Sequence, residues 1–129
     1  MLPLENFETV FSRCIQDPLF EELLQKVERA KHIFLIGNGG NMAVCAHGAT
    51  DLQQYLPNKT FYSFNDAIQL TALTSDHVAA QALSSWAISR IKNLPKEDCL
   101  FVFVSSSGQA ENIKNLRQYL DKSQIDHFM

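Results

Sequence analysis

Two short apolar segments, residues 32–36 and 100–104, constrain the fold most strongly, because each ends at small residues and leads directly into a helical pattern. Continuous apolar runs of this length are typical of parallel strands buried on both faces. The first is followed by Gly37-Asn-Gly-Gly-Asn41 and the second by Ser105-Ser-Ser-Gly108. A strand that runs straight into a helix is half of a βαβ unit, so the sequence predicts an α/β fold.

The rest of the chain alternates in the same way. Apolar positions at helical spacing cover residues 4–30, and Pro18 divides or kinks this region. We expect further helices at about 41–55, 66–73, 77–91 and 109–120, a weak strand at 60–63, a turn at 74–76, and the start of another strand within 123–129. This order predicts an open parallel sheet with helices on both faces, a three-layer α/β/α arrangement preceded by N-terminal helices.

Composition is that of a single globular domain. The chain has 129 residues, of which 46% are hydrophobic and 19% charged, and its net charge is -3. These values exclude a disordered or collagen-like chain, and the acidic balance argues against direct nucleic-acid binding. The three cysteines are widely spaced and odd in number, which indicates reduced thiols. No signal sequence or membrane-length apolar stretch is present, so we expect a cytoplasmic protein that does not bind membranes.

The two strand-to-helix turns are the candidate ligand site. Helix N-termini at the carboxyl ends of parallel strands offer N–H groups and a positive dipole end to a phosphate. Glycines let the backbone approach a ligand closely, and serine hydroxyls add uncharged donors. Met42 stands where a dinucleotide-binding motif needs glycine, and no P-loop is present, so we expect no nucleotide cofactor. Each turn could instead be only a tight connection, with the serines capping the next helix.

The segments Phe34-Leu-Ile-Gly-Asn-Gly-Gly-Asn41 and Phe103-Val-Ser-Ser-Ser-Gly-Gln109, with His47 and Asp51 between them, resemble the sugar isomerase (SIS) domain family. Within it they look most like the phosphoheptose isomerase branch, which also contains a replication-initiator-binding relative. The resemblance implies one SIS domain over residues 1–129 with a flavodoxin-like fold. It also implies ketose–aldose isomerisation of sedoheptulose 7-phosphate through an enediol-type intermediate, and a homo-oligomer, either a dimer or a tetramer.

The resemblance assigns roles to individual residues. Asp51 is the candidate general base and His47 a proton shuttle, and the two, four residues apart on one helix face, are also the candidate zinc ligands. Sugar-phosphate contacts are expected from Asn38, Gly39, Gly40, Asn41, Asp76, Ser105, Ser106, Ser107 and Gln109. Without the family resemblance, the usual roles of such residues are structural for His47, a solvated carboxylate for Asp51 and a helix N-cap for Asp76.

Four differences from the family pattern matter. Asn41 replaces the usual serine, Ala110 stands where a further serine is common, and Asp51 is one methylene shorter than the usual glutamate. The family also continues into a further strand and a final helix with a glutamine and a histidine, so we expect the domain to be incomplete at its C-terminus. Two alternatives therefore stay open. One is a SIS module that binds a sugar phosphate or a protein partner without turnover, and the other is an assembly protein whose N-terminal helices pack across subunits.

Cys45 and the aromatic residues are expected to pack rather than to react. Cys45 is two residues from His47 on the same helix and so points away from it, into the core. The aromatic residues at helical spacing are expected in the core or at a subunit interface, and these are Phe7, Phe11, Phe20 and Trp86.

Overall fold

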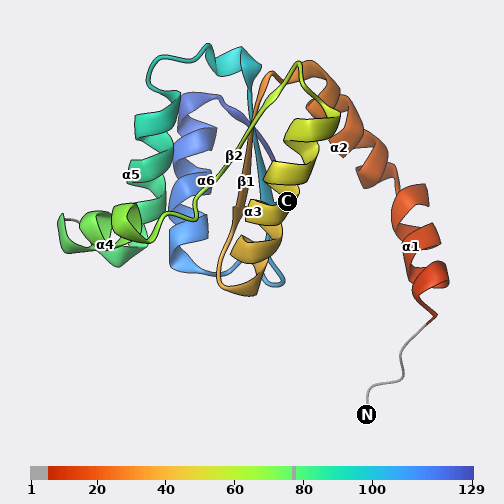
Figure 1. The fold of residues 1–129 in the computed structure, drawn as a ribbon, viewed down its shortest axis with the longest axis horizontal. Helices are drawn as coiled ribbons and strands as arrows, with labels where there is room; N and C mark the ends of the chain where they lie inside the picture. The colour runs from red at the N-terminus through yellow and green to blue at the C-terminus, as the bar shows by residue number, and fades with distance from the viewer. Residues whose placement is uncertain (1–5, 77) are drawn as a thin grey trace.

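The computed structural model describes residues 6–76 and 78–129, apart from the side chain of Asp76, and helices and strands alternate in that range as the sequence predicts (Figure 1). The helices are α1 (Phe7–Gln16), α2 (Pro18–Arg29), α3 (Gly40–Tyr55), α4 (Ala67–Asp76), α5 (Ala79–Ile91) and α6 (Glu111–Ser123), and a short 3-10 helix covers Lys96–Asp98. The strands are β1 (His32–Gly37), β2 (Thr60–Ser63), β3 (Cys99–Val104) and β4 (Asp126–Phe128).

The strands of the described residues form one parallel sheet in the order β2-β1-β3-β4. From β1 the chain first forms β2 on one side, and it then crosses back to form β3 on the other side of β1. The direction in which strands are added to the sheet therefore reverses between β1 and β3. Ligands of open α/β sheets bind at such a reversal, beyond the carboxyl ends of the strands. The pairing places Gly37 opposite Val104, so the turns that follow β1 and β3 begin side by side.

Apolar side chains fill both sides of the sheet. On one side the ring of Phe34 stacks on the rings of Tyr62 and Phe101, each at 4.4 Å between centroids, in a core that α5 and α6 cover (Figure 1). On the other side Ile33 and Leu100 are fully buried, and α3 packs against β1 and β2. The three-layer α/β/α arrangement is therefore confirmed.

Two capped helices precede the sheet. The Oδ1 of Asn6 accepts a hydrogen bond from the N–H of Glu8 (3.1 Å), and the Oδ1 of Asp17 accepts one from the N–H of Leu19 (2.9 Å). Pro18 takes the first position of α2, where its missing N–H costs no helical hydrogen bond, so the predicted division at Pro18 is confirmed. No residue of either helix is buried, and Figure 1 shows α1 extending away from the sheet.

Two predicted boundaries are wrong. α4 continues through Asp76, where the sequence predicts a turn. The hydroxyl of Thr74 donates back into the helix, to the carbonyls of Leu70 (2.9 Å) and Thr71 (3.1 Å), instead of taking part in a turn. α6 begins at Glu111 rather than near residue 109, because the preceding residues form a separate loop. The predicted helix start at His77 lies outside the described residues. None of the helices in the described ranges is long and apolar enough to cross a membrane.

Candidate functional site

The turn after β1 depends on its glycines for two separate reasons. Gly39 has a φ of 54° and a ψ of -124°, a backbone conformation in which residues other than glycine are strained. At Gly37 an added Cβ would lie 2.8 Å from the backbone carbon of Asn41, so a side chain there would collide with the first turn of α3. The tight turn from β1 into α3 therefore requires glycine at positions 37 and 39.

The start of α3 keeps N–H groups available to an anion. The N–H groups of Asn41 and Met42 donate to the carbonyl of Asn38, and that of Ala43 donates to the carbonyl of Gly39. Among the described residues nothing accepts from the N–H groups of Gly39 and Gly40. The first turn of α3 has no acidic side chain, so the positive end of its dipole is not neutralised.

The turn after β3 is ordered by its own serines. The Oγ of Ser105 accepts from the N–H of Gly108 (3.0 Å), and the Oγ of Ser107 accepts from the N–H of Gln109 (3.2 Å). The N-cap of α6 is Ala110, which has no side-chain acceptor, so the alternative that the serines cap α6 is wrong. They shape the loop instead, and Ser106 and Ser107 are exposed.

A reciprocal pair of amides joins the turn after β1 to the start of α6. The Nδ2 of Asn38 donates to the Oδ1 of Asn112 (3.0 Å), and the Nδ2 of Asn112 donates to the Oδ1 of Asn38 (2.9 Å). The Oδ1 of Asn112 also accepts from the N–H of Ile113 (2.9 Å), which holds the amide at the start of α6. Sequence reasoning missed Asn112, because an asparagine in the first turn of a helix carries no functional signal by itself.

A cavity of about 170 Å³ lies at the end of β1, beside this amide pair. Apolar side chains of α3, α4 and α5, with Phe64 after β2, form most of its wall, while Asn38, Gly39 and Asn112 contribute its polar groups. Ligand pockets usually measure about 300–1,000 Å³, so a sugar phosphate could place only one part of its structure here. The remainder of such a ligand would lie over the open surface of the two turns.

Several predicted site residues do not line this cavity. Asn41 is half-buried in the first turn of α3 and Gln109 is exposed ahead of α6, while Ser105, Ser106 and Ser107 follow β3. Asp76 is the last residue of α4 and its side chain lies outside the described part of the chain; the N-cap of α5 is Val78, so the alternative that Asp76 caps that helix is wrong.

His47 and Asp51 form a pair on the outer surface of α3. The Nε2 of His47 lies 3.2 Å from the Oδ2 of Asp51, and the two side chains are 82% and 51% exposed. Helical spacing therefore brings imidazole and carboxylate together as expected. Neither residue lines the cavity at the end of β1.

The described residues do not make a complete zinc site. Zinc in proteins takes three or four protein ligands, and His47 with Asp51 supplies two. Within residues 6–76 and 78–129 no group of three or more histidine, cysteine, aspartate or glutamate residues could hold a metal ion. Cys45, on the same helix, is 1% exposed, and burial raises the pKa of its thiol, so it packs as predicted and stays protonated.

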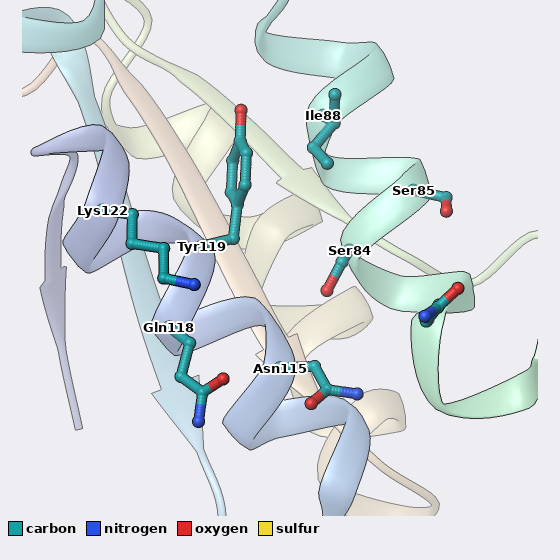
Figure 2. Close-up of a pocket in the computed structure, with 8 residues that line it drawn as sticks. Ser84, Ser85, Ile88, Asn115, Gln118, Tyr119 and Lys122 are labelled. Atoms are coloured by element: carbon teal, nitrogen blue, oxygen red, sulfur yellow. The ribbon is translucent and has the colours of Figure 1, made fainter.

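A second hollow lies between α5 and α6, away from both turns. It measures about 370 Å³, and its polar lining includes Ser84 of α5 and Asn115, Tyr119 and Lys122 of α6 (Figure 2). The Oγ of Ser84 is buried without a hydrogen-bond partner, whereas the Nδ2 of Asn115 donates to the carbonyl of Ala80 (3.1 Å) and ties the two helices together. This hollow was not predicted from the sequence, and no residue of the two turns contributes to it.

Comparisons with known proteins support the fold. No protein-family model and no curated protein matches this sequence. Among solved structures the chain is similar to phosphoheptose isomerase GmhA from Neisseria gonorrhoeae, with a TM-score of 0.70 and 19% sequence identity over 93% of this chain. The match covers 64% of that isomerase chain. At this identity the similarity establishes a shared SIS-like fold.

Proposed function

We propose that this chain binds a sugar phosphate across the ends of β1 and β3 and acts as a phosphoheptose-type isomerase on sedoheptulose 7-phosphate. The observation that carries the proposal is the Asn38–Asn112 amide pair, with bonds of 3.0 and 2.9 Å, which joins the uncharged turn after β1 to the start of α6 at the strand reversal. The shared fold with a phosphoheptose isomerase supports the choice of substrate class.

The phosphate is expected at the two turns. The N–H groups of Gly39 and Gly40 and the positive end of the α3 dipole favour a dianion without needing a lysine or arginine. The exposed hydroxyl of Ser106 can turn toward the same oxygens. Glu111 in the first turn of α6 is acidic, which makes the α3 side of the site the better position for the phosphate.

The proton transfers are assigned to α3. Asp51 takes the proton from the carbon beside the carbonyl while His47, as imidazolium 3.2 Å from Asp51, protonates the carbonyl oxygen, which leaves an enediol. The neutral His47 then takes the proton of the other enediol hydroxyl, and Asp51 returns its proton to the former carbonyl carbon, which completes the aldose–ketose exchange and restores both groups. His47 is seven residues beyond Gly40, which is about 10 Å along the helix axis, so the sugar would have to extend from the turns along α3.

Binding without turnover is the second candidate function. It is favoured by the exposure of His47 (82%) and Asp51 (51%), because general bases work best where water is excluded. In this version the turns hold a sugar phosphate, or the same surface receives a protein partner, and no proton is transferred. A cytoplasmic location is part of either version and is supported by the free thiols of Cys14, Cys45 and Cys99.

Calorimetric titration with sedoheptulose 7-phosphate and an isomerisation assay test both versions. An isomerase turns the substrate over, and Asp51→Asn lowers kcat by about 100-fold or more while binding remains. Glu28→Gln, which removes an exposed carboxylate from α2, is the matched control and leaves kcat unchanged. Binding with no turnover supports the second version. Absence of binding contradicts the isomerase and also contradicts a module that binds this sugar phosphate.

A further inference from the structure

The hollow between α5 and α6 has the size and the lining of a ligand site. It measures about 370 Å³, within the range of about 300–1,000 Å³ that ligand pockets usually occupy, whereas the cavity at the end of β1 measures about 170 Å³. Most of its lining residues carry a hydroxyl or an amide group, and these are Gln81, Ser84, Ser85, Asn115, Gln118 and Tyr119 (Figure 2). Such groups suit a ligand that is itself rich in hydrogen-bonding groups.

Ser84 brings to this hollow a buried hydroxyl that its own helix does not satisfy. Its Oγ is buried and has no hydrogen-bond partner among the described residues. A serine within a helix can donate to a carbonyl three or four residues earlier, as the Oγ of Ser89 does to the carbonyl of Trp86 (2.7 Å). Four residues before Ser84 is Ala80, whose carbonyl instead accepts from the Nδ2 of Asn115 (3.1 Å). A buried hydroxyl without a partner costs free energy, and a ligand in the hollow would supply the missing hydrogen bond.

Lys122 gives the hollow a single positive charge. Figure 2 shows its ammonium group turned toward the hollow, and no ion pair joins it to any residue that the structure describes. None of the described residues that line the hollow is acidic, so a cationic group on a ligand would find no counter-charge there. One lysine acts as one point charge, which matches the single charge of a carboxylate better than the double charge of a phosphate.

We propose that this hollow binds a sugar acid, which is a short chain of hydroxyl groups with one carboxylate. The carboxylate pairs with Lys122, and the hydroxyls bond to the buried Oγ of Ser84 and to the amide of Gln118, which donates and accepts at once. The C–H groups of the sugar lie against Tyr119 and Ile88 (Figure 2). This inference goes beyond the proposed function and does not depend on it, because no residue of the turns after β1 and β3 lines the hollow.

Titration of the isotope-labelled full chain with gluconate and with glucuronate, followed by amide NMR, tests the site. At least one acid is expected to shift the signals of α5 and α6 around the hollow, and glucitol, which lacks the carboxylate, is expected to bind at least about fivefold more weakly. Lys122→Met should raise the Kd of the acid by a similar factor. Lys114→Met is the matched control, because it removes an exposed lysine of α6 that does not line the hollow. Binding of neither acid overturns the proposal, and so does an equal effect of the two lysine variants.

Ser84→Ala separates a ligand contact from a structural role. Because the Oγ of Ser84 has no partner in the free protein, its removal should leave Tm unchanged or slightly higher, yet raise the Kd of the acid about threefold or more. A lower Tm with an unchanged Kd overturns the assignment. Asn38→Ala, in the turn after β1, should leave this Kd unchanged. If Asn38→Ala weakens binding and Lys122→Met does not, the acid binds at the turns and the proposal is wrong.

Discussion

The amide pair between Asn38 and Asn112 gives the sharpest test of how the turn after β1 is held against α6. Asn38→Ala removes both hydrogen bonds of the pair, and each such bond contributes about 0.5–1.5 kcal/mol to the free energy of unfolding. Because the pair is exposed, the lower part of that range applies, and we expect a loss of about 1–1.5 kcal/mol. Asn112→Ala should cost more, since its Oδ1 also accepts from the N–H of Ile113.

A double-mutant cycle by urea denaturation isolates the pair itself. We expect a coupling free energy of about 1 kcal/mol between the two positions, and a shift in Tm of about 3–5 °C per kcal/mol for a domain of this size. Asn93→Ala, in the exposed loop after α5, is the control and should be nearly neutral. A coupling energy of zero, with both single variants as stable as the control, would show that the amides do not hold the turn after β1 against α6.

Three further predictions concern the fold around the site. Phe34→Ala should lower the free energy of unfolding by about 3–5 kcal/mol in urea denaturation, because the ring is 0% exposed and stacks on two others. Gly39→Ala should cost about 1–3 kcal/mol through its φ of 54°, whereas Gly40→Ala, where an added Cβ meets nothing within 4 Å, should be neutral or slightly stabilising in the same measurement. Burial, with Asp98 and Glu97 nearby, raises the pKa of Cys99 from an ordinary 9.0 to about 11. The folded state therefore holds this proton more tightly than the unfolded state, so the stability that Cys99 contributes is full below pH 9 and is lost as the pH rises toward 11. Cys99→Val should flatten that part of the stability profile, and an unchanged profile would contradict the assignment.

The layers and the position of the candidate site could be predicted from local sequence. Apolar runs at 32–36 and 100–104 have one stable location in an α/β domain, the buried middle of a parallel sheet. Glycines and serines directly after them can lie only at the carboxyl ends of those strands. The carboxyl ends of parallel strands lie at the same edge of the sheet. The two turns are therefore expected to lie close together even when the side-chain contacts are not known.

The side-chain partners within the site could not be predicted in this way. Asn38 and Asn112 are 74 residues apart, and their pairing depends on the angle at which α6 leaves the sheet, which no local pattern encodes. Capping of α6 was the alternative role for the serines, but Ser105 and Ser107 accept hydrogen bonds from loop N–H groups, and two more residues intervene before the helix begins. Exposure of Phe7 and Phe11 was likewise open, since an apolar stripe fits an internal core and an interface equally well.

The row of stacked rings in the core also fixes the strand register on which the candidate ligand site depends. Tyr62, Phe34 and Phe101 are directly paired across β2, β1 and β3, so a slip of one residue would turn one ring to the opposite face of the sheet. The same slip would displace Gly37 by about 3.3 Å along its neighbour, more than a hydrogen bond between the turns can absorb. Substitutions in this row are therefore expected to impair ligand binding at a distance, by misaligning two loops whose own residues are unchanged.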